Sequence, residues 1–84
     1  MELSARFEDA QARAKKLTGM PSNDELLELY ALFKQGTVGD ATGARPGMLD
    51  FRARAKFDAW ASKRGMTKDA AMAAYVAFVD GLGI

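Results

Sequence analysis

The segment KQGTVGDATGARPGMLDF, residues 34–51, constrains the fold most, because it separates two strongly helical patterns with residues that mostly do not join a helix. Structureless connections of this length in compact domains are usually functional or disordered. A lysine stands at the entrance of this connection, and a basic segment follows its exit. The connection is too long for a simple turn, so it is a candidate part of a functional site.

Two helices are predicted before the connection, since apolar residues recur there at helical spacing. The segment GMPS, residues 19–22, breaks the first pattern, and SNDE then forms a capping box with Ser22 at the N-cap and Glu25 three residues on. The second helix is expected from about Asn23 to Gln35. Its apolar surface is unusually broad, so it is either central or partly faces something other than protein. The stripe of the first helix is Leu3, Phe7, Ala10, Ala14 and Leu17.

Two more helices are predicted after the connection. Asp50 is the expected N-cap of the third helix, Gly65 its expected C′ residue, and Thr67 the expected cap of the fourth. Four helices and no credible strand predict an all-α bundle, and the length predicts a single domain over residues 1–84. Lys63 and Arg64 are expected to complement the dipole of the third helix, and Phe57 and Trp60 are expected in the core.

The net charge of +1 hides an asymmetry, because residues 1–33 sum to −2, residues 34–68 to +5 and residues 69–84 to −2. A basic middle segment attracts anions such as phosphates, nucleic acid or acidic lipid headgroups, and a solvated basic surface is the alternative. No apolar run approaches the roughly 18 residues of a membrane span, and MELSARFEDA resembles neither a signal nor a transit peptide. We expect a cytoplasmic monomer without stable membrane insertion.

The sequence contains neither histidine nor cysteine, so the most common general base, the thiolate nucleophile and the usual transition-metal ligands are missing. None of the eleven carboxylates sits in a pair or motif that suggests catalysis, and neither glycine-rich phosphate-binding motif occurs. We therefore expect no enzymatic activity, no metal site and no cofactor.

Aromatic and basic residues recur at helical spacing on both sides of the connection. Tyr30 and Lys34 are four residues apart on the second helix, and Arg52 and Lys56 repeat this spacing on the third. If these cations converge, an anion that joins them, such as a phosphomonoester, explains the cluster best. Tyr30 and Tyr75 add hydroxyl groups and flat faces for stacking a base. Core tyrosines and surface lysines are the alternative interpretation.

Several segments match one known family. LYALFKQGTVGD (residues 29–40), ARPGMLDF (44–51), AKFDAW (55–60) and KRGMTKDAAMAAY (63–75) closely resemble the acyl-CoA-binding protein family. The resemblance implies a four-helix up-down-down-up bundle with a shallow surface site for acyl-CoA thioesters. In such a bundle the second and third helices run in the same direction, so the long connection becomes an ordered crossover between them.

The resemblance also implies a ligand site. The adenine and 3′-phosphate of the head group would be held by two tyrosines and two lysines, with Arg52 near the phosphates, and the acyl chain would lie along the second and third helices. Phe33 stands where members often have tyrosine, and Gly36 where they usually have alanine. The expected ligand-binding residues are Lys15, Leu27, Tyr30, Ala31, Leu32, Phe33, Lys34, Arg52, Lys56 and Tyr75.

The function that these features predict is non-catalytic binding and transport or buffering of medium- to long-chain acyl-CoA inside the cell. A small helical module that binds nucleic acid through residues 34–68 is the alternative. A peripheral membrane-surface domain is a third possibility, although no predicted helix combines a basic face with a bulky apolar one.

Overall fold

The computed structural model describes residues 2–16 and 21–83, and these form four α-helices without a strand. They are α1 (Leu3–Ala14), α2 (Asn23–Thr37), α3 (Phe51–Ala61) and α4 (Lys68–Gly81). The all-α prediction is therefore confirmed. Leu17 of the predicted stripe and the first two residues of the predicted break at 19–22 lie outside the described residues.

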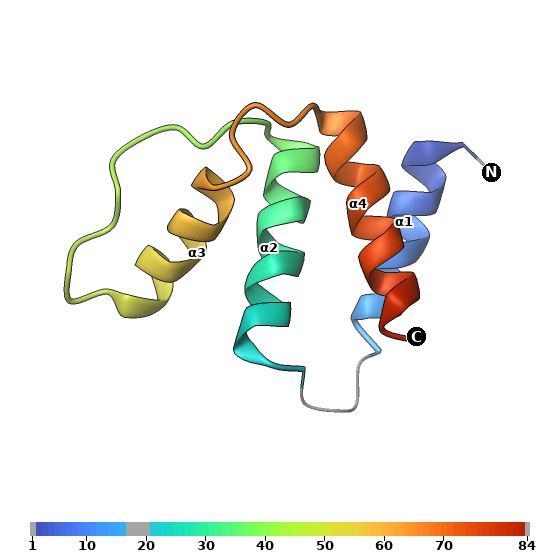
Figure 1. The fold of residues 1–84 in the computed structure, drawn as a ribbon, viewed down its shortest axis with the longest axis horizontal. Coiled ribbons are helices and arrows are strands. Elements are labelled where there is room, and N and C mark those ends of the chain that lie inside the picture. Colours follow the sequence, from blue (N-terminus) through green and yellow to red (C-terminus); the bar gives the residue numbers. More distant parts are fainter. Residues whose placement is uncertain (1, 17–20, 84) are drawn as a thin grey trace.

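The helices follow the predicted up-down-down-up order. Figure 1 shows α2 and α3 running in one direction and α1 and α4 in the other, with the crossover between α2 and α3 arching away from the bundle. In the described chain, α2 packs against both α3 and α4, α4 also packs against α1, and α3 packs against no helix other than α2. The bundle is consequently flat, with extents of 40 × 29 × 15 Å.

The three predicted helix caps are confirmed. Ser22 accepts from the Glu25 amide at 3.1 Å while the Glu25 carboxylate accepts from the Ser22 amide at 2.9 Å. Asp50 caps α3, and Thr67 accepts from the Ala70 amide at 3.1 Å to cap α4. Each cap satisfies amides that the first turn of a helix leaves without an intrahelical partner.

The predicted end of the third helix is wrong. α3 stops at Ala61 with Ser62 as its C-cap, and Gly65 is the last residue of the turn that follows at residues 62–65, where it has the expected positive φ of 93°. Lys63 pairs with Glu28 on α2 at 2.8 Å rather than standing free near the helix end. Arg64 donates to the Ala41 carbonyl at 3.1 Å. Lys63 thus joins the turn after α3 to α2, and Arg64 joins the same turn to the crossover.

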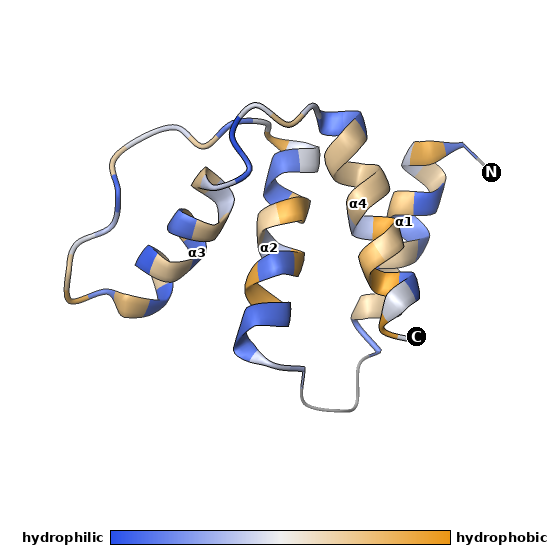
Figure 2. Ribbon diagram, in the orientation of Figure 1, coloured by the Kyte–Doolittle hydropathy of each residue, from blue (hydrophilic) through white to orange (hydrophobic). Residues whose placement is uncertain are grey.

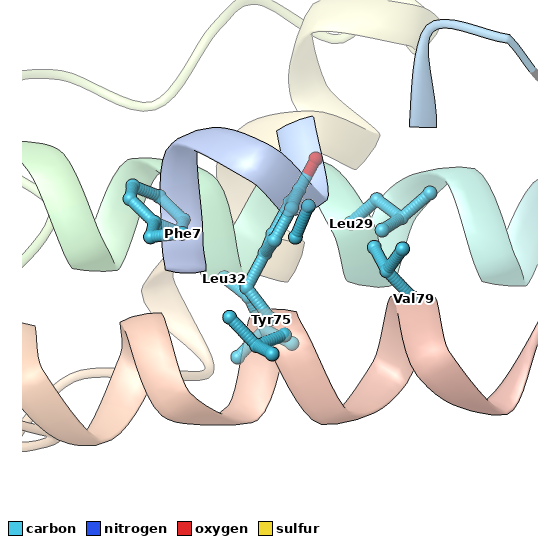
Figure 3. Packing of buried hydrophobic residues seen from close by; sticks show 7 residues of the cluster. Phe7, Leu29, Leu32, Tyr75 and Val79 are labelled. Carbon is cyan, nitrogen blue, oxygen red and sulfur yellow. The ribbon is translucent and has the colours of Figure 1, made fainter. Parts of the chain in front are cut away.

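The core lies between α1, α2 and α4. Figure 3 shows Tyr75 extending from α4, with Phe7 on one side of its ring and Leu29 with Val79 on the other. The ring of Phe7 meets that of Tyr75 edge-on at 5.1 Å between centroids. Trp60 is buried as predicted, whereas Phe57 is only half-buried. The buried cluster is Phe7, Ala10, Leu29, Leu32, Tyr75, Val76 and Val79.

Polar contacts hold the start of the crossover against the turn after α3. The fully buried Gln35 donates through Nε2 to Asp40 Oδ1 at 2.8 Å and to the Met66 carbonyl at 2.7 Å. The same Asp40 oxygen accepts from the Gly65 amide at 2.8 Å, and these bonds keep the pKa of Asp40 below its ordinary value. Trp60 Nε1 donates to the Gly39 carbonyl at 2.8 Å.

Farther along the crossover, Arg45 forms two hydrogen bonds with Asp58 on α3, of 2.8 and 2.7 Å. This bidentate ion pair lowers the pKa of Asp58 and raises the pKa of Arg45, because each charged group stabilises the charged form of the other. The crossover is therefore attached to α3 at both its start and its middle.

Candidate functional site

Two open hollows adjoin one another between α2 and α3. The first has a volume of about 400 Å³ and the second about 520 Å³. Arg52 and Lys56 belong to the walls of both, so these two cations stand between the hollows. The first is also lined by Tyr30, Pro46, Asp50, Ala53, Phe57 and Trp60, and the second by Asn23, Leu26, Leu27, Phe51 and Ala55.

The first hollow combines aromatic rings with cations. Lys56 Nζ lies 5.4 Å from the centroid of the Tyr30 ring, and Lys34 Nζ lies 4.9 Å from that of Trp60. Both distances are within the range of cation–π attraction. The ring of Phe57 meets that of Trp60 near-perpendicularly, at 6.3 Å between centroids. The hollow thus presents positive charge beside flat apolar faces, a combination suited to a group with phosphate and an aromatic base.

This arrangement follows from the parallel course of α2 and α3. Tyr30 and Lys34 are separated by one helical turn on α2, and Lys56 and Trp60 by one turn on α3. Because both helices rise in the same direction, two cross-helix pairs form at successive levels, Tyr30 with Lys56 and Lys34 with Trp60. Each helix contributes one ring and one ammonium group, so the long crossover is a structural requirement of the site.

The second hollow is mainly apolar. Leu26 and Leu27 form its α2 side, and Phe51 and Ala55 its α3 side. Leu26 is 48% exposed and Phe51 75%, so a large part of this apolar wall is open to solvent. The broad apolar surface predicted for α2 therefore includes both core residues and residues that protein does not cover.

The structure brings five of the predicted site residues to these hollows. Tyr30, Arg52 and Lys56 line the first, Leu27 lines the second, and Lys34 reaches the first hollow's Trp60 wall.

Three other predicted residues on α2 are directed at the protein interior. Ala31 is fully buried and Leu32 is 2% exposed, so neither side chain lies on an open surface. Phe33 stacks against Phe7 of α1 at 6.2 Å between centroids and packs on the core cluster. These three residues therefore contribute to the interior of the bundle and line neither hollow.

The last two predicted residues, Tyr75 and Lys15, lie on α4 and at the end of α1 and line neither hollow. Tyr75 is 5% exposed within the core, and burial raises the pKa of its hydroxyl. Lys15 is exposed at the end of α1. In the described chain, no hydrogen bond or ring contact joins either residue to the α2–α3 group.

Trp60, which was predicted only as a core residue, also lines the first hollow. Its ring is buried yet supports the ammonium group of Lys34 and forms part of the first hollow. The sequence contains a signal for this position, because Lys56 and Trp60 are four residues apart, as Tyr30 and Lys34 are, and such a spacing places both side chains on one helix face. Phe51 and Leu26, which line the second hollow, were also missed.

The described residues contain no group of three or more His, Cys, Asp or Glu side chains that could hold a metal ion. No helix among them is both long enough and apolar enough to cross a bilayer.

Comparison with known proteins agrees on one family. The family model described as acyl CoA binding protein matches residues 4–79. The chain is 56% identical over 80 residues to acyl-CoA-binding protein homolog 1 of Caenorhabditis elegans, covering 95% of this chain and 93% of that one. It is 49% identical over 83 residues to the Manduca sexta homolog, with 98% and 92% covered. The crystal structure of Oryza sativa acyl-CoA-binding protein 2 superposes with a TM-score of 0.93 at 42% identity, covering 96% of this chain and 90% of that one.

Proposed function

Because the chain belongs to the acyl-CoA-binding protein family, we infer that it binds medium- to long-chain acyl-CoA thioesters in the cytoplasm and transports or buffers them without catalysis. The observation that carries this inference is the pair of adjoining hollows that share Arg52 and Lys56. A ligand with an anionic head and an apolar tail can occupy both hollows while its phosphates contact the cations between them.

The head group is assigned to the first hollow. Coenzyme A is polyanionic, and Lys34, Arg52 and Lys56 supply three cations around this space. Hydrogen bonds between ammonium or guanidinium groups and phosphate are roughly twice as strong as neutral ones. The adenine would stack on the Tyr30 ring, for which it competes with the Lys56 ammonium group. Lys15 and Tyr75 remain proposed contacts that rest on the family resemblance alone.

The acyl chain is assigned to the second hollow. Its apolar walls, Leu27 and Phe51 among them, can remove methylene groups from water. Each buried methylene contributes about 0.8 kcal/mol, so affinity should rise with chain length until the hollow is full. Free fatty acid has the tail without the phosphates and should bind weakly.

Isothermal titration with coenzyme A, octanoyl-CoA and palmitoyl-CoA tests this function, with palmitate and single-stranded DNA as controls. We expect affinity to increase in that order of the three CoA ligands and to exceed that for either control. Equal affinity for all three would remove the apolar hollow from the proposal. Tighter binding of DNA than of palmitoyl-CoA would instead favour the nucleic-acid alternative.

A further inference from the structure

Three bulky apolar side chains project from the outer corner of the crossover. Met48 is 75% exposed, Leu49 91% and Phe51 75%, and we call this group the apolar tip. In the described chain, the other exposed large hydrophobic residues are Leu26 and Val38. Figure 2 shows hydrophobic colour at this corner, where the crossover enters α3. Most of the exposed bulky apolar side chains among the described residues are thus concentrated in one place.

A tight turn fixes the apolar tip in its outward position. The Asp50 amide donates to the Gly47 carbonyl at 3.0 Å, so Met48 and Leu49 occupy the two central positions of a four-residue turn. Asp50 also caps α3, which joins this turn rigidly to the helix. Central turn positions are usually Gly, Pro, Asn, Asp or Ser. Methionine and leucine at these positions are therefore unusual, and both side chains are exposed.

The ligand hollows account for only part of this surface. Phe51 lines the second hollow, whereas Met48 and Leu49 are not among the residues that line either one. The bound ligand assigned above therefore leaves Met48 and Leu49 in water. A contiguous exposed apolar group of this kind marks a candidate contact surface for a different partner.

The charges around the apolar tip favour an anionic partner. Residues 45–56 contain four Arg or Lys and one Asp, a net charge of +3. The single acid, Asp50, is engaged as the α3 cap, while Arg52 and Lys56 are exposed. Asp58 pairs with Arg45 and offsets its charge, so Arg52, Arg54 and Lys56 carry the remaining positive charge near the apolar tip. Acidic Asp24 and Glu25 precede Leu26 on α2, so the positive field belongs to the α3 side.

We propose that the turn at residues 47–50 and the first turn of α3 dock onto the surface of an anionic phospholipid bilayer. Met48, Leu49 and Phe51 enter the boundary between headgroups and acyl chains, and the cations of α3 contact lipid phosphates. The contact is peripheral, since only one turn and the start of one helix take part. The second hollow then opens beside the bilayer, because Phe51 belongs to both the apolar tip and that hollow.

Sedimentation with lipid vesicles tests this proposal on the chain without ligand. Wild-type protein should pellet with vesicles of phosphatidylcholine and phosphatidylglycerol at low salt, and much less with phosphatidylcholine alone or at high salt. Leu49→Ser should lower the partition coefficient at least about fivefold, and the double variant Met48→Ser/Leu49→Ser further. The matched control is Val38→Ser, which removes a 50% exposed side chain at the far end of α2 and should change partitioning less than about twofold.

Three outcomes would overturn the proposal. Wild-type protein that stays in solution with anionic vesicles removes the bilayer as a partner. Equal losses in Leu49→Ser and Val38→Ser show that no particular surface is involved. Self-association that Leu49→Ser abolishes, measured by analytical ultracentrifugation, assigns the apolar tip to a second copy of the chain instead.

A palmitoyl-CoA titration of Leu49→Ser separates this proposal from the ligand site. We expect wild-type affinity, because Leu49 lines neither hollow, and an unchanged circular dichroism spectrum. A loss of ligand affinity in parallel with vesicle binding would place the apolar tip within the ligand site and would contradict a separate membrane surface.

Discussion

The two halves of this molecule are held together in different ways. The half formed by α1, α4 and the inner face of α2 buries a continuous apolar cluster that includes Phe7, Tyr75 and Val79. Among the described residues of the other half, formed by α3 and the crossover, Trp60 is the one large buried side chain. Hydrogen bonds and ion pairs also attach this half to α2 and link α3 to the crossover. Stability is therefore concentrated in the first half, and the second leaves cations and apolar side chains uncovered for partners.

The largest effect that should distinguish the halves is the loss of a core ring. Phe7→Ala removes a side chain that is 5% exposed and contacts the rings of Phe33 and Tyr75, so unfolding free energy should fall by about 3–5 kcal/mol. Phe57→Ala in the other half is the matched variant and should cost only about 1 kcal/mol, because Phe57 is half-buried at an open hollow. Urea unfolding measures both. Equal losses would contradict the division into halves.

The second prediction separates binding from stability. Lys34→Ala should weaken palmitoyl-CoA binding by about 1.5–3 kcal/mol, because it removes a charged hydrogen bond to phosphate. Its effect on unfolding should stay below about 1 kcal/mol, since the ammonium group stabilises the fold through a cation–π attraction to the Trp60 ring. Calorimetric titration and urea unfolding measure the two quantities. The control is Lys16→Ala, an exposed lysine after α1, which should leave ligand affinity unchanged.

The third prediction concerns the hydrogen bonds by which Gln35 of α2 holds the crossover and the segment after α3. Gln35→Ala should cost about 1–2 kcal/mol, because it leaves the Met66 carbonyl without its donor inside the fold. The buried Oε1 of Gln35 has no partner in the described chain, which limits what the side chain contributes. Hydrogen exchange should accelerate at the Gly65 and Trp60 donor groups more than in α1. Uniform acceleration throughout would show that the halves open as one unit.

Local features of this fold could be predicted from the sequence because their causes lie within a few residues. The caps at Ser22, Asp50 and Thr67 are examples, since each side chain binds an amide three residues on. The spacing of Tyr30 from Lys34 likewise placed both groups on one face of α2. The contacts of Lys63 and Arg64 after the end of α3 could not be predicted this way, because their partners, Glu28 and the Ala41 carbonyl, lie far away in the sequence.

The site depends on contacts between residues far apart in the chain. The pairing of Lys34 with Trp60 requires the parallel course of α2 and α3, which periodicity alone does not specify. Gln35 can donate to both Asp40 and the Met66 carbonyl only when the fold brings these two acceptors to it, and Met66 is 31 residues from Gln35 in the sequence. The apolar tip was missed for another reason. Helical periodicity identifies apolar helix faces, whereas Met48 and Leu49 lie on a turn.

The fourth prediction uses pH to weaken the second half selectively. The pKa values of Asp40 and Asp58 are lowered, chiefly by bonds from the Gly65 amide and from Arg45. Their contribution to stability is therefore complete above the ordinary aspartate pKa of about 3.9 and is lost as pH falls through the lowered values. Asp58→Asn should reduce the decline of the urea midpoint between about pH 5 and pH 2. A decline identical to that of the wild type would exclude this contribution.

The smallest predicted effect tests how tightly the first half is packed. Gly36 lies at the α2–α4 contact, where an added Cβ would stand 3.1 Å from Met72 Cγ and 3.4 Å from Phe7 Cζ. Relative to glycine, alanine favours the helix by about 1 kcal/mol. Its Cβ, however, fits only if the Met72 side chain shifts by a few tenths of an ångström. Methionine is flexible and half-buried here, so Gly36→Ala should stabilise the fold by about 0.5 kcal/mol. Gly81→Ala, whose Cβ meets nothing within 4 Å, measures the propensity gain without a packing cost near the end of α4. If Gly36→Ala destabilises while Gly81→Ala does not, Met72 is held by the core, and the first half is less adaptable than its flexible side chains suggest.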